Sequence, residues 1–158
     1  LIVIACGTAT SQALEEIKKI YPIPIIGVLE PTAKYLQAKQ KKQIGVIATA
    51  GTIRSKGWET ILLEKIPDAN LQTIACPLLA QLVEEGWAEG EIADLVVKEY
   101  LKPLEKIEAL ILGCTHYPLL INSIQKQVGK EVEIINIGVH TATEVQKLLK
   151  EQEISTKT

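Results

Sequence analysis

Methionine is absent from all 158 residues, and Leu1 already lies in an apolar, strand-like run. We therefore expect the natural start of the polypeptide to precede Leu1, so that the chain is a fragment. Long apolar runs are absent too. The longest, such as residues 1–6 and 109–112, are far shorter than the ~20 residues of a helix that crosses a bilayer, which excludes a membrane span.

Basic clusters and paired cysteines are scarce. The formal net charge is -2, and only Lys39, Lys41 and Lys42 cluster, so the sequence lacks the basic surface that nucleic-acid binding requires. Three cysteines are an odd number, and no secretory signal is recognisable, which is typical of a reducing compartment. We expect a cytoplasmic protein.

Signatures of common cofactor sites are also missing. Neither GxxxxGK[ST] nor GxGxxG occurs, so no phosphate-binding loop of these kinds is present. The closely spaced pairs of cysteines or histidines that hold structural zinc are absent. The sequence therefore predicts neither a nucleotide cofactor nor a metal.

Six short apolar runs are present, and they alternate with helical patterns. Most are rich in Val and Ile, as in strands buried on both faces of a parallel sheet. The alternation predicts an α/β fold in which helices flank parallel strands. The predicted strands are Leu1–Ala5, Ile23–Val28, Ile44–Ala48, Leu71–Ala75, Ala109–Leu112 and Val132–Ile135.

Apolar residues at helical spacing predict the buried faces of the helices between these strands. The region from Leu78 to Leu104 is long enough for two helices, with a break near Gly86 and Gly90. The polar end, from Glu151 to Thr158, is expected to fray. The predicted faces are Leu14, Ile17 and Ile20; Ile92, Leu95, Val96 and Tyr100; Ile121, Ile124 and Val128; and Val145, Leu148 and Leu149.

Two cysteines follow predicted strands in the same way. Cys6 and Cys114 each precede a threonine by one or two residues and then a helical segment, at the strand ends where functional groups of open α/β sheets gather. A helix N-terminus lowers the pKa of a thiol and favours a thiolate, which serves as base or nucleophile. The alternative, that both cysteines pack as small apolar residues, stays open. Cys76 is interpreted as structural, because Pro77 follows it and no hydroxyl or imidazole accompanies it.

Threonine hydroxyls fall at the same predicted edge. Beside helix N-termini they suit a substrate carboxylate, although a role as helix N-cap is an equal alternative for Thr52. His116 is either the partner of a Cys–His pair or a surface imidazole. Glu84 is an ordinary exposed carboxylate unless it lies against His116. The hydroxyls belong to Thr8, Thr10, Thr49, Thr52 and Thr115.

Five motifs occur in a fixed order: Ala5-Cys6-Gly7-Thr8-Ala9-Thr10, Ile26-Gly27-Val28-Leu29-Glu30-Pro31, Ile44-Gly45-Val46-Ile47-Ala48-Thr49, Ala75-Cys76-Pro77-Leu78 and Gly113-Cys114-Thr115-His116-Tyr117-Pro118. With these motifs the chain resembles, over nearly its whole length, the glutamate racemases of the aspartate/glutamate racemase superfamily. The last motif is the specific one, because related aspartate racemases usually carry an acidic residue in place of His116.

The resemblance implies a cofactor-independent isomerase of two flavodoxin-like lobes, which interconverts L- and D-glutamate and supplies D-glutamate for peptidoglycan. It implies that Cys6 handles the α-proton of D-glutamate and Cys114 that of L-glutamate. Glu84 matches the acidic partner of the histidine that supports the second cysteine. Together with the hydroxyl pattern, the expected substrate contacts are Gly7, Thr8, Thr49, Thr52, Thr115 and His116.

The chain departs from the family pattern in three places. Gly7 replaces the usual Asn, Asn136-Ile137-Gly138 replaces an Asp-Ser-Gly-like turn, and the N-terminal Asp-Ser-Gly and Pro-Tyr-Gly segments have no counterpart. We therefore expect residues 1–30 and 137–158 to form part of an incomplete first lobe, 31–136 to form the second, and racemisation to be weak or absent. A non-catalytic α/β small-molecule-binding domain, and a racemase or decarboxylase of another acidic substrate, stay open. A homodimer is compatible with the resemblance.

Overall fold

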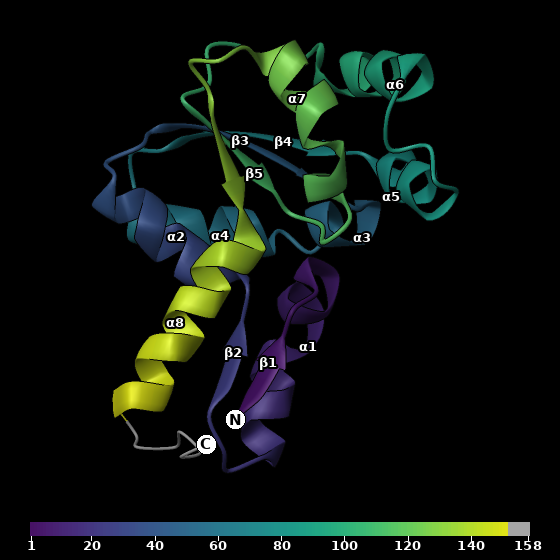
Figure 1. Cartoon of the computed structure of the whole chain (residues 1–158). Coiled ribbons are helices and arrows are strands. Elements are labelled where there is room, and N and C mark those ends of the chain that lie inside the picture. Colours follow the sequence, from purple (N-terminus) through teal and green to yellow (C-terminus); the bar gives the residue numbers. More distant parts are fainter. Residues whose placement is uncertain (152–158) are drawn as a thin grey trace.

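The structure, a computed structural model, describes residues 1–151 and consists of parallel sheets flanked by helices (Figure 1). One sheet pairs β1 with β2, and the other has the order β4-β3-β5-β6. Every pairing is parallel, which confirms the α/β prediction and all six strand positions. The strands are β1 (Ile2–Ile4), β2 (Ile25–Gly27), β3 (Gln43–Ala48), β4 (Asn70–Ala75), β5 (Ala109–Leu112) and β6 (Glu133–Asn136).

Helices connect the strands. The predicted break between two helices is confirmed at Gly86 and Gly90, whose φ angles of 77° and 91° lie in the left-handed region that favours glycine. The helices are α1 (Gly7–Ile20), α2 (Leu29–Ala38), α3 (Ala50–Arg54), α4 (Gly57–Lys65), α5 (Pro77–Glu84), α6 (Glu91–Leu101), the 3-10 helix η1 (Tyr117–Leu120), α7 (Ile121–Val128) and α8 (Ile137–Glu151).

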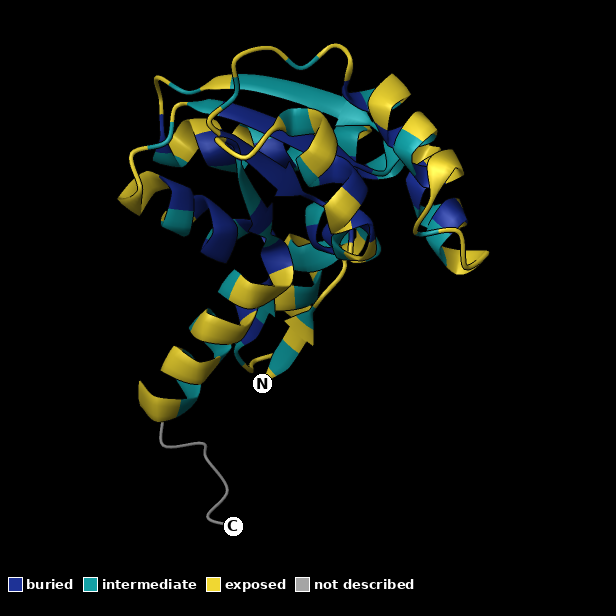
Figure 2. Cartoon of the chain, turned by 45° about the horizontal axis from the view of Figure 1, so that its top comes forward, coloured by how far each residue is buried: buried dark blue, intermediate teal, exposed yellow. Residues whose placement is uncertain are grey.

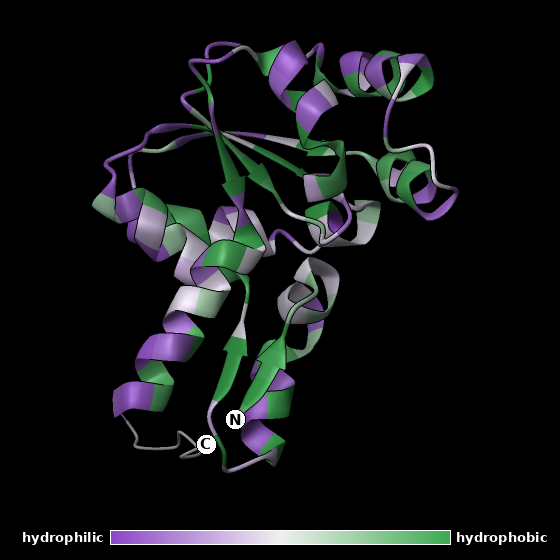
Figure 3. Cartoon of the chain, in the orientation of Figure 1, coloured by the Kyte–Doolittle hydropathy of each residue, from purple (hydrophilic) through white to green (hydrophobic). Residues whose placement is uncertain are grey.

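The two central strands of the four-stranded sheet, β3 and β5, are buried on both faces, whereas the edge strand β4 is only half-buried (Figure 2). The apolar residues of these strands are green in Figure 3. Side chains of β5 alternate between the faces. Leu110 and Leu112 pack toward α5, α6 and α7, whereas Ala109 and Ile111 pack toward α2 and α4. Full burial of such an aliphatic side chain stabilises the fold by about 1.5–3 kcal/mol, so this sheet supplies the rigid frame for the loops at its carboxyl edge.

The buried face of α6 agrees with the prediction at Val96 and Tyr100, which pack against the core, but not at the other two positions. Ile92 and Leu95 are 53% and 60% exposed, and the helix instead buries Ala93, Val97 and Leu101. These three residues recur every four positions and form the ridge that packs into the core beside α5 and α7. The sequence pattern predicted a neighbouring stripe of the helix surface because apolar residues occur on both stripes.

The two-stranded sheet is held mainly by α1. Gly27 permits the close approach of this helix, since a Cβ atom there would lie 2.3 Å from Cγ2 of Thr10. The Thr10 hydroxyl donates to the carbonyl of Ile4 and accepts from the backbone N–H of Val28, which ties both strand ends to α1. Because this hydroxyl is used within the fold, Thr10 is not available to a substrate.

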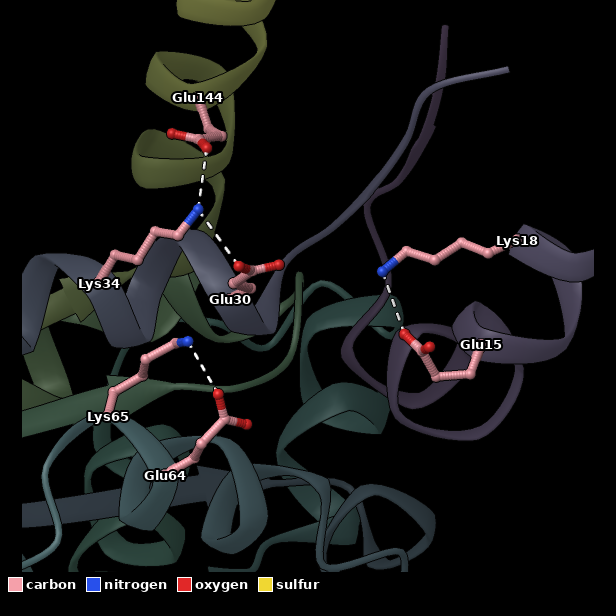
Figure 4. A network of polar contacts seen from close by, with 7 residues as sticks. All are labelled: Glu15, Lys18, Glu30, Lys34, Glu64, Lys65 and Glu144. Carbon is pink, nitrogen blue, oxygen red and sulfur yellow. Dashed lines mark hydrogen bonds and ion pairs between the residues drawn. The ribbon is translucent and has the colours of Figure 1, made fainter. Parts of the chain in front are cut away.

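Helix α8 runs from the end of β6 alongside the two-stranded sheet and packs on α2 (Figure 1). Lys34 of α2 joins the two helices through Glu144 of α8 at 3.2 Å, and it also pairs with Glu30 of its own helix at 3.2 Å (Figure 4). No helix within residues 1–151 is long and apolar enough to cross a membrane. The proposed lobe limits stay a prediction, and residues 152–158, including most of the polar end expected to fray, lie outside the described part.

Candidate active site

The turn that follows β1 touches the turn that follows β5. Cys6 immediately precedes α1, and Cys114 lies two residues after β5. A Cβ atom placed on Gly7 would lie only 2.4 Å from the carbonyl oxygen of Gly113, so the two backbones are in contact and only glycine fits. Cys6 directly precedes Gly7, and Cys114 directly follows Gly113. The fold therefore brings both thiol-bearing turns to one junction between the sheets.

The two thiols differ in their surroundings. Cys6 is exposed, whereas Cys114 is only 8% exposed. Burial raises the pKa of the Cys114 thiol, and the nearby Cys6 raises it further, although hydrogen bonds with His116 and Thr115 act in the opposite direction. The expectation that its position before a helix would lower the pKa of Cys114 is therefore wrong, because desolvation outweighs the backbone donors. Cys114 rests as a protonated thiol near neutral pH.

His116 connects Cys114 to Glu84. Its Nδ1 atom lies 3.6 Å from Cys114 Sγ, and its Nε2 atom is hydrogen-bonded to the carboxylate of Glu84 at the end of α5. A carboxylate only accepts, so in the neutral ring the Nε2 atom carries the proton and Nδ1 accepts from the thiol. The structure thus gives Glu84 the basic partner that distinguishes it from an ordinary exposed carboxylate.

Three predicted hydroxyls meet where α1 approaches α3. Thr8 Oγ1 lies 2.9 Å from Thr49 Oγ1 and 2.8 Å from Thr52 Oγ1, and the latter two are 2.9 Å apart. We call these three side chains the hydroxyl triangle. The N-cap of α3 is Thr49, which accepts from the backbone N–H of Thr52 at 3.3 Å, rather than Thr52 itself. Thr115 lies apart from the triangle and is exposed.

A largely apolar cavity of about 740 Å³ opens beside the thiols, between β1, η1 and α8. Ala5 and Thr115, the neighbours of the two cysteines, form part of its wall. Within residues 1–151, no group of three or more His, Cys, Asp or Glu side chains is placed to hold a metal ion. The polar groups that converge at the junction are thiols, hydroxyls, one imidazole and one carboxylate, which suit proton transfer on a small anionic molecule.

Tyr117 is a residue to which the sequence pattern gave no role. Its buried hydroxyl donates to the carbonyl of Cys76 at 2.7 Å and fixes the Cys114 turn to the end of β4. Cys76 itself is fully buried, and burial raises the pKa of its thiol to about 12, which agrees with a structural role. A sequence signal for this residue was present, since Tyr117 belongs to the most specific of the five motifs.

Comparisons with known proteins place the chain in a family. Residues 1–144 match the family model of the Asp/Glu/Hydantoin racemases. The chain is 40% identical over 157 residues to a glutamate racemase of Geobacter metallireducens, which covers 98% of this chain and 58% of that protein. It is 45% identical over 154 residues to a glutamate racemase of Aquifex aeolicus, covering 96% of this chain and 59% of that protein.

A crystal structure of glutamate racemase from Francisella tularensis in complex with D-glutamate matches with a TM-score of 0.93 at 34% identity, over 99% of this chain and 59% of that one. The chain thus spans less than two thirds of the length of these relatives. The match to the family model covers nearly the whole sequence. On these grounds the chain belongs to the Asp/Glu/Hydantoin racemase family.

Proposed function

We propose that this chain carries the two-thiol centre of a cofactor-independent glutamate racemase. The observation that carries the proposal is the contact between the Cys6 turn and the Cys114 turn, which come from different sheets and meet at Gly7 and Gly113. The relative that binds D-glutamate supports the choice of substrate. Inversion at a stereocentre needs acid–base groups on two faces, and two separate turns supply them.

Protons and electrons balance in a single exchange. Starting from D-glutamate, the Cys6 thiolate takes the α-proton, the C–H bond breaks, and its electron pair moves into the carboxylate. Cys114, which its burial keeps protonated, gives a proton to the opposite face and becomes the thiolate. The product is L-glutamate with the two thiol states exchanged, and the reverse reaction uses the same groups in opposite roles. A single base would return the proton to the face from which it came.

His116 and Glu84 serve the Cys114 side of this exchange. When L-glutamate is the substrate, Nδ1 of His116 first takes the thiol proton of Cys114, which leaves the thiolate that accepts the α-proton, and Glu84 stabilises the charge that develops on the ring. The hydroxyls of Thr8 and Thr115, with the backbone at Gly7, supply donors for the α-carboxylate, whose charge grows as the proton leaves. The carboxylate is thus held most tightly when it carries the most charge.

The test is solvent deuterium exchange at the α-carbon of D- and L-glutamate, followed by NMR, with the Aquifex aeolicus relative as positive control. We expect slow exchange at both faces, loss of inversion in Cys6→Ser and in Cys114→Ser, and protection of both thiols from iodoacetamide by glutamate. The Cys76→Ser variant is the matched control. Failure of both enantiomers to protect Cys6 and Cys114 would overturn the proposal. Protection by aspartate but not glutamate would assign another acidic substrate.

The same proposal places the protein in the cytoplasm, where D-glutamate is made for peptidoglycan. Three unpaired thiols support a reducing compartment. A homodimer is part of the proposal as well, and light scattering of the purified chain measures it directly. A monomer at all concentrations would remove the dimer and leave the catalytic assignment untouched.

A further inference from the structure

The hydroxyl triangle joins the two thiol-bearing halves of the site. Thr8 belongs to α1 and follows Cys6 by two residues, whereas Thr49 and Thr52 lie at the end of β3 and in α3. Within residues 1–151, the hydroxyls of Thr8 and Thr52 have hydrogen-bond partners only inside the triangle. Thr52 also lies against Gly7, the point at which the two turns touch.

The number of hydroxyl protons limits how many hydrogen bonds the hydroxyl triangle can donate. Three hydroxyls carry three protons, and three contacts of 2.8–2.9 Å consume all of them if the triangle closes as a ring. A closed ring leaves no donor for a carboxylate. For Thr8 to donate outward, its own proton must leave the ring, so the protons of Thr49 and Thr52 serve two of the three contacts and the third contact has none.

Burial separates the three hydroxyls into two kinds. Thr52 is 1% exposed, so its hydroxyl is closed off from a bound ligand, whereas Thr8 is only partly buried. Thr49 already accepts the backbone N–H of Thr52, so the Thr52 hydroxyl proton is better directed at Thr8. Thr8 has two lone pairs and can accept from both neighbours while it donates to a third group.

We propose that Thr49 and Thr52 are positioning residues: their hydroxyls donate to Thr8 and thereby direct the Thr8 hydroxyl proton at the substrate carboxylate. Hydrogen bonds in such a chain polarise one another, so the donation from Thr8 is strengthened by the two that it receives. This inference rests on the proposed function, because it takes the carboxylate of glutamate as the acceptor. It predicts that Thr52 affects substrate binding only through Thr8.

The test is a double-mutant cycle on D-glutamate affinity, measured by titration calorimetry on Thr8→Val, Thr52→Val and the double variant. We expect Thr8→Val to weaken binding about tenfold or more and Thr52→Val about 2- to 12-fold. The double variant should bind no worse than Thr8→Val alone, and Thr52→Ser, which keeps the hydroxyl, should bind like the wild type. Thr32→Val is the matched control, because Thr32 is equally buried but donates within its own helix region, to Val28.

Each outcome decides the matter. Additive losses in the double variant, or a Thr52→Val variant with wild-type affinity, would overturn the inference. If Thr52→Val does not fold, Thr52→Ala takes its place in the same cycle, and the unfolding midpoint of each variant shows that folding is intact. A wild-type chain that binds glutamate without exchanging deuterium overturns the proposed function alone. A chain that binds neither enantiomer overturns both.

Discussion

Replacement of Gly7 by alanine tests the contact on which the site is built. The added Cβ would lie 2.4 Å from the carbonyl oxygen of Gly113, whereas such contacts essentially never fall below 3.0 Å, so the turns must separate by at least 0.6 Å. A shift of the same size along the line from Thr8 to Thr52 would lengthen their 2.8 Å contact to about 3.4 Å, where a hydroxyl hydrogen bond is weak. Overpacking of this kind costs about 1–3 kcal/mol.

Gly51→Ala is the matched control in the same site. A Cβ atom there would meet Gln12 and Thr8 at 3.4 Å, which is ordinary contact, so this change should stabilise the chain by about 0.4–1 kcal/mol through the unfolded state. Urea unfolding measures both free energies, and calorimetry with D-glutamate measures affinity. We expect Gly7→Ala to lose stability and affinity together. If Gly7→Ala matches Gly51→Ala in stability, the close contact with Gly113 does not exist in solution.

Three further outcomes are expected. Tyr117→Phe removes the hydrogen bond to the buried carbonyl of Cys76 and should lower the free energy of unfolding by about 1–3 kcal/mol in urea; an unchanged value would refute the anchoring role. The folded-state pKa of Cys76 is raised to about 12, so its stabilising contribution is present below pH 9 and is lost as the pH rises, by at most about 1.4 kcal/mol per pH unit. Between pH 9 and 10, the free energy of unfolding should therefore fall less steeply with pH in Cys76→Ala than in the wild type. Equal slopes would contradict the raised pKa. Glu84→Gln should slow deuterium exchange from L-glutamate, the substrate of Cys114, about tenfold or more relative to D-glutamate. Equal slowing with both enantiomers would show that Glu84 does not act on Cys114 through His116.

The strand pattern determined the fold class. The runs Ala109–Leu112 and Ile44–Ala48 have no polar residue that could face solvent, so they specify strands buried on both faces, and the structure places them at the centre of the larger sheet. The buried face of α6 was not determined in this way, since apolar side chains such as Leu95 and Val97 occur on two stripes. Only the position of the neighbouring helices selected one of them.

The sequence by itself also placed Cys6 and Cys114 at strand ends, because that depends on local order along the chain. Tertiary structure alone decided that the two turns touch through Gly7, and that desolvation raises rather than lowers the pKa of Cys114. It also closed the hydroxyl triangle, whose members are up to 44 residues apart. Distances between segments and the water excluded from them are properties of packing, and no local pattern of residue types encodes them.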